Sequence, residues 1–72
     1  MPTYTGDMIR KYRTEKGLTQ KKLGELCGIA DSAIRRYEAG NANPKIETLQ
    51  KIADALDIPV NRLRAGKIYN WG

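Results

Sequence analysis

Histidine is absent from this 72-residue sequence, and cysteine occurs once, at position 27. A single cysteine excludes an internal disulfide, on which secreted domains of this size usually depend. Without histidine or a second cysteine, the ordinary zinc sites are also excluded, and we expect no metal or other cofactor. No nucleophile–base pair and no paired carboxylates stand out, so an enzyme is the least favoured class of function.

Long apolar stretches are also missing. No run approaches the roughly 18 residues of a membrane-spanning helix, and residues 1–9 lack the basic and apolar regions of a signal peptide. The sequence has no internal repeat, no low-complexity segment and no alternation typical of strands. Together with the short length, these absences predict one small cytoplasmic domain that makes no contact with a membrane.

Positive charge is present in excess and is unevenly placed. The net charge is +5. Eight basic and three acidic residues lie between Arg10 and Arg36, whereas acids and bases balance between Tyr37 and Gly66. Such one-sided placement is typical of proteins that bind a polyanion such as nucleic acid. The alternative is a basic protein with a solvated face, and charge alone does not decide between the two.

Apolar spacing and turn residues predict an all-α chain. Thr19 is a suitable N-cap, and Gly17 and Gly28 are placed to end helices. Pro44 and its neighbouring asparagines predict a loop at 41–44. The five expected helices span Thr5 or Asp7 to Glu15, Gln20 to Cys27, Asp31 to Ala39, Ile46 to Leu56, and Pro59 to Arg64.

The second and third of these helices have the spacing of a helix-turn-helix. We expect Gly28 in the left-handed conformation, and Gly24 has no side chain to keep the next helix away. Cys27 points inward and is therefore interpreted as a small core residue, not a reactive thiol. The expected core comprises Ile9, Tyr12, Leu23, Leu26, Cys27, Ile34, Tyr37, Ile46, Leu49, Ile52, Ala53, Leu56, Val60 and Leu63.

The outward face of the predicted helix 31–39 is short, polar and basic. Ser32 and Arg36 lie opposite the core-facing Ile34, and Asp31 is at the N-terminal end. Residues so placed reach base edges when a helix enters the major groove of DNA. Arg36 can donate hydrogen bonds to O6 and N7 of guanine, and Asp31 can accept one from the N4 amino group of cytosine. Ser32 can donate to or accept from several bases. The alternatives are a solvated Arg36 and a capping or helix-dipole role for Asp31.

The start of the predicted helix 20–27 is a candidate phosphate site, because helix N-termini attract anions. Lys21 and Lys22 have the wrong sign for the helix dipole at this end, and a bound phosphate would offset the mismatch. The alternative is that both lysines are simply exposed to solvent, where their unfavourable interaction with the helix dipole costs little stability. The candidate phosphate contacts from this reasoning are Thr19, Gln20, Lys21, Lys22, Asn43 and Lys45.

Arg13 and Glu38 are predicted to form a structural ion pair. Each lies about 40° around its helix from an apolar residue, Ile9 and Ile34 respectively, so partial burial is expected. A buried charge requires a partner, and these two have opposite signs.

With these motifs the sequence resembles the Cro and phage-repressor type of helix-turn-helix proteins, often called XRE-like, over about residues 6–64. The resemblance is carried by Ile9–Arg13, Lys16–Gln20, Leu23–Ile29, Ile34–Gly40, Asn43–Pro44 and Thr48–Leu56. It implies a compact five-helix bundle of the lambda-repressor-like type, operator DNA as ligand, a homodimer on a two-fold site and no catalysis. The site residues that it implies are Asp31, Ser32 and Arg36 for bases, Gln20, Arg35 and Asn43 to Lys45 for phosphates, and the Arg13–Glu38 pair.

Four positions depart from the family pattern. Ala30 stands where many members have a capping Ser or Thr, and Lys45 stands where many begin the fourth helix with Ser. Lys21 and Lys22 occupy positions where many members carry an acid. The lysines raise the positive charge near the expected DNA.

The leading interpretation is a sequence-specific regulator of transcription, a repressor, with its DNA-binding domain at 1–66 and a tail at 67–72. The alternative is an antitoxin or adaptor that uses the same fold to hold a protein partner. DNA binding through phosphates weakens steeply with salt, whereas an apolar protein interface weakens little. For Tyr69 and Trp71 three roles stay open: packing on the first helix, a dimer contact, or a link to a second domain.

Overall fold

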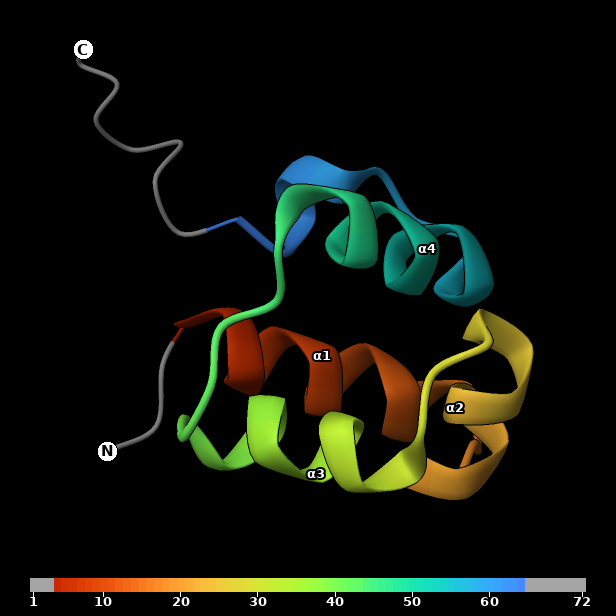
Figure 1. The fold of residues 1–72 in the computed structure, drawn as a ribbon. Helices are drawn as coiled ribbons and strands as arrows, with labels where there is room; N and C mark the ends of the chain where they lie inside the picture. The colour runs from red at the N-terminus through yellow and green to blue at the C-terminus, as the bar shows by residue number, and fades with distance from the viewer. Residues whose placement is uncertain (1–3, 65–72) are drawn as a thin grey trace, which may run out of the picture.

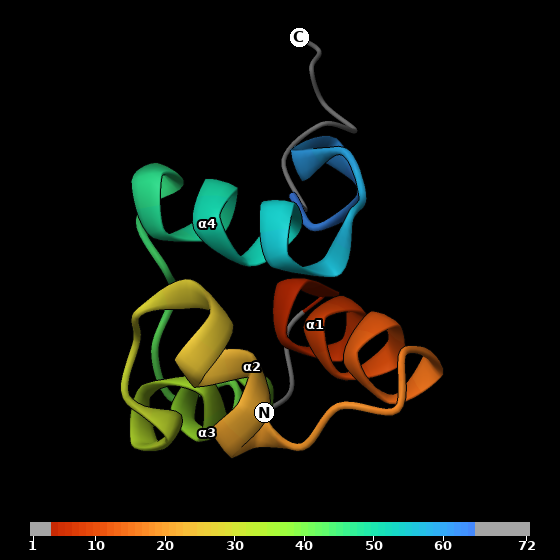
Figure 2. The same cartoon turned by 90° about the vertical axis from the view of Figure 1, so that its right-hand side faces the viewer.

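The computed structural model describes residues 4–64, and the tail residues Tyr69 and Trp71 lie outside this described part. Its elements are α1 (Tyr4–Glu15), α2 (Gln20–Cys27), α3 (Asp31–Ala39), α4 (Ile46–Leu56) and the 3₁₀ helix η1 (Val60–Arg62). In Figure 1 α3 lies in front of α1, and α4 with the following segment lies above them. The view from the side shows the same two layers, with α2 and α3 below α4 (Figure 2).

The predicted ends of the middle helices are confirmed. The Thr19 hydroxyl oxygen accepts a hydrogen bond from the backbone N–H of Lys22 at 3.0 Å, so Thr19 is the N-cap of α2. Gly28 follows α2 with φ of 72°, and Gly40 follows α3 with φ of 81°. These left-handed conformations suit glycine and let the chain turn sharply at both places. The spacing in the sequence therefore sets the bounds of α2 and α3.

The prediction of a fifth α-helix is wrong. Within the described residues there are four α-helices, and the segment after Pro59 makes only the 3₁₀ turn of η1. Its backbone bonds join residues three apart, from Arg62 N–H to Pro59 and from Leu63 N–H to Val60. The carbonyl of Leu63 accepts from the Thr5 hydroxyl at 2.7 Å, a bond to α1. The chain is thus tied to α1 at the point where a helix would have to continue.

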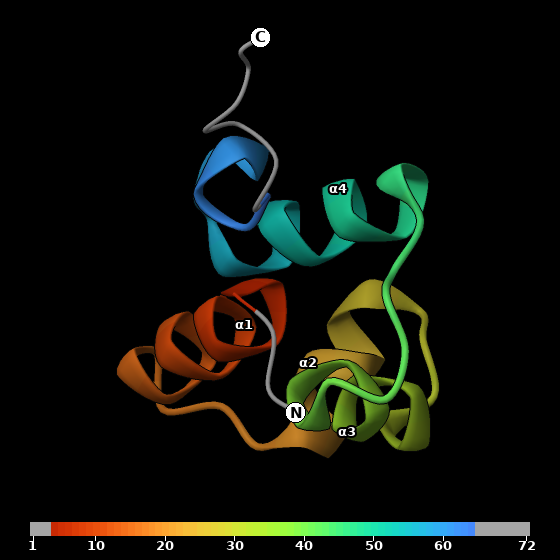
Figure 3. The same cartoon turned by 90° about the vertical axis from the view of Figure 1, so that its left-hand side faces the viewer.

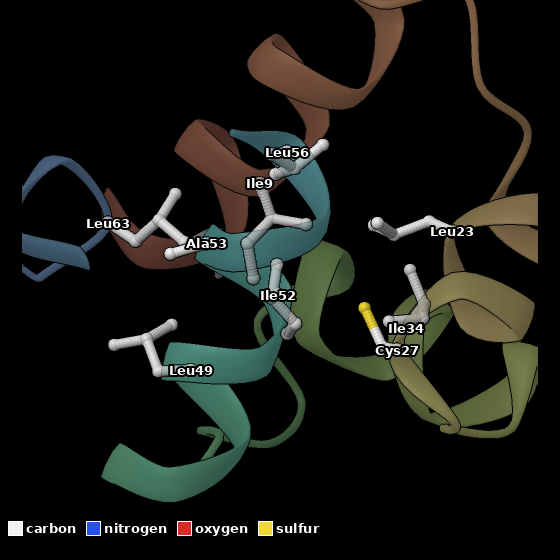
Figure 4. Packing of buried hydrophobic residues seen from close by; sticks show 9 residues of the cluster. All are labelled: Ile9, Leu23, Cys27, Ile34, Leu49, Ile52, Ala53, Leu56 and Leu63. Carbon is white, nitrogen blue, oxygen red and sulfur yellow. The ribbon is translucent and has the colours of Figure 1, made fainter. Parts of the chain in front are cut away.

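Among residues 4–64, nine buried apolar side chains form the core, and all four α-helices contribute to it (Figure 4). Leu63 is among them, so its predicted place in the core is confirmed although its helix is absent. Tyr12, Tyr37 and Val60 are partly buried and pack against the same cluster. The nine residues are Ile9, Leu23, Cys27, Ile34, Leu49, Ile52, Ala53, Leu56 and Leu63.

Two residues predicted for the core are instead exposed. Leu26 and Ile46 each keep 54% of their surface accessible. On a helical projection Leu26 lies on the opposite side of Leu23 from Cys27, about 100° from the latter, and the core takes the Cys27 side. Ile46 is the first residue of α4, so no preceding helical turn shields it. Both are corrections to the apolar stripes expected from spacing.

Gly24 permits a close approach of backbone to backbone. A Cβ at this position would collide with the carbonyl oxygen of Ile29, in the turn between α2 and α3. From the sequence we expected the next helix to pass close to Gly24. The close contact is instead with the turn that precedes this helix. Gly6 serves the same purpose on α1, where a Cβ would collide with the carbonyl oxygen of Tyr37. The two glycines thus let α1 approach α3 closely, and let α2 approach the turn that leads into α3.

In the described range, 4–64, none of the helices combines the length and the apolar character needed to cross a bilayer.

Candidate nucleic-acid interface

The outward face of α3 carries the predicted base-reading residues. Asp31, Ser32 and Arg36 are exposed, as is the flanking Arg35, while Ile34 on the opposite side is fully buried. Figure 1 shows α3 along the lower edge of the molecule, with α1 and α4 above it. The helix therefore presents a polar ridge and is fixed to the core by its other side.

Asp31 lies in the first turn of α3 and faces Arg35. The Arg35 Nη2 to Asp31 Oδ2 distance is 3.8 Å, and both side chains are about half exposed. Ala30 occupies the N-cap position and makes no side-chain capping bond, as its chemistry requires. The carboxylate of Asp31 therefore complements the helix dipole and offsets part of the Arg35 charge. Such an exposed pair is weak, of about 0–1 kcal/mol, so both side chains are available to a ligand.

A concave pocket of about 410 Å³ lies between α3 and the start of α4. It brings together three residues that the sequence singled out, namely Arg36, Asn43 and Lys45. In Figure 2 the chain between α3 and α4 rises along the side of the molecule on which α3 lies. The other lining residues are Ala33, Tyr37, Ala42 and Thr48.

Thr48 is the lining residue that sequence reasoning missed. It lies in the first turn of α4, three residues after Lys45. Residues three apart on a helix lie on one side, and this spacing was the available signal. The hydroxyl adds a hydrogen-bond donor to a pocket whose charged side chains, Arg36 and Lys45, are both cationic.

The start of α2 presents a second group of predicted residues. Thr19, Lys21 and Lys22 are exposed, and Lys22 Nζ lies 3.9 Å from the carboxylate of Glu25. No acidic residue stands in the first turn of α2. The free backbone N–H groups at the start of α2 and the ammonium groups of Lys21 and Lys22 thus make the N-terminal end of this helix positively charged. Gln20 behaves differently, because its side-chain amide donates to Glu38 at 3.0 Å.

The side chain of Glu38 is fully buried and accepts hydrogen bonds from three side chains on two helices, α1 and α2. Arg13 of α1 donates to it through Nε at 2.6 Å and Nη2 at 3.0 Å, which is a bidentate pair. Arg10, also on α1, lies at 3.4 Å, and Gln20 adds its amide from α2. Arg13 further donates through Nη1 to the carbonyl of Leu18 at 2.8 Å. The sequence pointed to the Arg13 partner but missed Arg10, which is one helical turn earlier on α1.

The surroundings of Glu38 keep it ionised. Burial by itself would raise the pKa of this carboxyl, but the hydrogen bonds from Arg13 and Gln20 and the charge of Arg13 together lower the pKa below its ordinary value. The thiol of Cys27 shows the opposite balance. Burial raises its pKa, and the charge of Lys51 offsets this only in part, which fits a core residue and not a nucleophile.

Within residues 4–64, no three His, Cys, Asp or Glu side chains gather where they could hold a metal ion. The described polar groups on α2, α3 and the start of α4 are instead suited to hydrogen bonding and to anions.

Two short helices joined at Gly28, with the second helix exposed along one face, define a helix-turn-helix protein. Comparison with known proteins agrees: the family model described as "Helix-turn-helix" (HTH_3) matches residues 9–63. The chain belongs to this family.

Individual relatives and solved structures are similar over most of this chain. The SPbeta prophage-derived uncharacterized HTH-type transcriptional regulator YonR of Bacillus subtilis is 33% identical over 61 residues, covering 85% of this chain and 56% of the relative. The crystal structure of the restriction-modification controller protein C.AhdI from Aeromonas hydrophila has a TM-score of 0.82 and 36% identity, covering 85% of this chain and 92% of the other. The biofilm regulator SinR, solved in complex with DNA, has a TM-score of 0.79 and 37% identity, covering 82% and 95%.

The curated relatives are longer than the matched region. The chain spans 56%, 42% and 42% of the length of the first three. The family assignment therefore concerns the helix-turn-helix region.

We predict that Arg13→Ala lowers the free energy of unfolding by about 3–5 kcal/mol, because it leaves the buried Glu38 carboxylate without its main partner. Arg10→Ala is the matched control. Its side chain is 62% exposed, so the expected loss is below about 1 kcal/mol. Urea denaturation at neutral pH measures both. Equal losses in the two variants would contradict the assignment of Arg13 as the main partner.

A second prediction concerns pH. The pKa of Glu38 is lowered in the folded protein, so its contribution to stability is present above the unfolded pKa of about 4.3 and is lost as pH falls through the folded value. Replacing Glu38 with Gln should therefore flatten the dependence of unfolding free energy on pH below about pH 4.3. Glu15→Gln, at an exposed position, should keep the original slope. An unchanged slope in the Glu38 variant would show that this carboxyl is not the titrating group.

Proposed function

We propose that this chain is a sequence-specific regulator of transcription that binds double-stranded DNA and acts as a repressor, with α3 in the major groove. The observation that carries the proposal is the exposed ridge of α3. Ser32 and Arg36 project from it, while its opposite side is locked into the core by Ile34 and Glu38. A rigid helix with exposed hydrogen-bonding side chains is what base readout in the major groove requires.

In this proposal the bases are read by Asp31, Ser32 and Arg36. Arg36 donates to O6 and N7 of a guanine, which discriminates against other bases by about 1–3 kcal/mol. Asp31 accepts from a cytosine amino group and repels phosphates, so it also acts against misplaced binding. Its separation of 3.8 Å from Arg35 requires only a small rearrangement of exposed side chains.

Phosphate contacts flank α3 on two sides. The N-terminal end of α2 supplies Thr19, Lys21 and Lys22, and Arg35 lies on α3 itself. The pocket at the start of α4 supplies Asn43 and Lys45 next to Arg36. Gln20 keeps one amide hydrogen on Glu38 and has a second for a phosphate oxygen. These contacts would position α3 in the groove and provide much of the affinity.

The DNA-binding unit in this proposal is residues 1–66, and it acts as a homodimer. One such domain offers few base contacts, and a two-fold dimer doubles them on two half-sites about one helical turn apart. The DNA complex of SinR, similar to this chain at 37% identity, supports the proposed ligand. The prophage-derived regulator YonR, named as a transcriptional regulator, supports the proposed role.

Arg36→Ala is predicted to relax the preference for one G·C pair in each half-site, with a loss of about 1–3 kcal/mol on the preferred sequence and little loss on others. Lys45→Gln is the matched comparison, because it removes a cation from the same pocket without removing a base reader. It should weaken all sequences alike and reduce the slope of log affinity against log salt by about 1 per protomer. Titration of labelled duplexes at several salt concentrations measures both effects.

Uniform weakening by Arg36→Ala would instead make Arg36 a phosphate contact. An antitoxin or adaptor role is the competing function for the same fold. It would be favoured if the chain bound no duplex tightly at low salt, or if its binding to a protein partner proved insensitive to salt.

A further inference from the structure

A second concave surface lies between α1 and η1, away from the proposed DNA-binding residues. It encloses about 420 Å³ and is lined by Tyr4, Met8, Lys11, Tyr12, Asn61 and Arg62. None of these six residues lines the pocket between α3 and α4. We call this surface the α1–η1 groove.

The chemistry of the α1–η1 groove suits an aromatic side chain. Lys11 Nζ lies 5.4 Å from the centroid of the Tyr12 ring, and Arg62 Nη1 donates to the Tyr12 hydroxyl at 3.5 Å. Two cations therefore contact a half-buried tyrosine, and Met8 lines the same groove. Cations and thioether sulfur both bind aromatic rings well. Among the described residues none that lines the groove is acidic, so a basic peptide or a free cation is not its natural occupant.

The chain leaves the described region beside this groove. The Thr5 hydroxyl donates to the carbonyl of Leu63 at 2.7 Å, and the Leu63 side chain is fully buried. Figure 3 shows the segment that contains η1 above α1, on the same side of the molecule. Leu63, one residue before the end of the described chain, is thus held beside Thr5, the sequence neighbour of the groove residue Tyr4.

Residues 65–72 have the composition and the length to fill the groove. They contain Ile68, Tyr69 and Trp71, and Trp71 is the only tryptophan of the chain. The distance along α1 from Tyr4 to Tyr12 is about 12 Å at 1.5 Å per residue. Five residues beyond Arg64 reach up to about 17 Å, so Tyr69 and Trp71 can reach any point of the groove. Ala65 and Gly66, which follow Arg64 in the sequence, have no bulky side chains that would restrict the direction of the backbone.

We propose that the α1–η1 groove is the binding site for residues 67–71 of the same chain, with the rings of Tyr69 and Trp71 against Met8, Lys11 and Tyr12. A tethered segment this short has an effective concentration in the millimolar range. At micromolar protein, the tail of a second copy cannot compete with it. The tail thereby covers the groove and ties the first half of α1 to η1. This proposal does not rest on DNA binding.

Fluorescence of Trp71 in the full chain tests the proposal, because no other tryptophan contributes. Quenching by acrylamide is measured in the folded chain and in urea, together with the emission maximum. We expect the folded chain to be quenched roughly twofold less than the unfolded chain and to emit at shorter wavelength, since a packed indole is shielded from water. The protection should not change with dilution over about two decades below the effective concentration of the tether.

Met8→Gln should abolish the protection, whereas Leu26→Gln, an apolar-to-amide change at an exposed site on α2, should leave it intact. A circular dichroism melt shows whether each variant is folded, and Lys11→Gln, at an exposed position in the groove, replaces Met8→Gln if that variant unfolds. Full quenching of the wild-type chain overturns the proposal, as does protection that survives every groove variant. Protection that disappears on dilution also overturns it, because the occupant is then the tail of another copy.

Discussion

The arrangement of this protein depends on the buried carboxylate of Glu38. A charge with no exposed surface in its side chain is tolerated only when hydrogen bonds and opposite charges compensate its lost hydration. Arg13 supplies a bidentate partner from α1 and Gln20 supplies an amide from α2. One residue of α3 thus defines the positions of two other helices. Any rotation of α3 about its axis would break these bonds and expose Ile34.

That constraint explains why the outward face of α3 is usable. Glu38 and Ile34 fix which side of the helix points inward, so Ser32 and Arg36 can only point outward. Gly24 and Gly6 contribute by letting backbone approach backbone closely on both sides of α3. The hydrogen bonds of Glu38 and the apolar core therefore hold α3 in the same orientation. A helix intended to read base edges must hold its side chains within a narrow range of orientations, and this packing provides that rigidity.

Much of the fold could be predicted from the sequence, because its signals were local. The hydroxyl of Thr19 and the left-handed glycines at 28 and 40 act within a few residues, so the ends of α2 and α3 were predictable. The exposure of Leu26 was not, because it depends on which side of α2 faces α4, and that is a tertiary choice. The prediction of a fifth α-helix was wrong for the same reason, namely that a tertiary contact decided the structure. The bond from Thr5 to Leu63 joins residues 58 positions apart, and no local sequence pattern predicts it.

For the site, the sequence indicated single residues. It did not predict that Arg36, Asn43 and Lys45 line one pocket, because that depends on where α4 packs.

The most direct measurement is selection of bound duplexes from a random DNA pool by the purified chain at low salt. The proposed function predicts enrichment of a two-fold symmetric sequence, with half-sites about one helical turn apart and a preferred G·C pair in each. A recovered pool with the composition of the starting pool would contradict it, since an exposed α3 ridge that discriminates no sequence is not a base-reading helix.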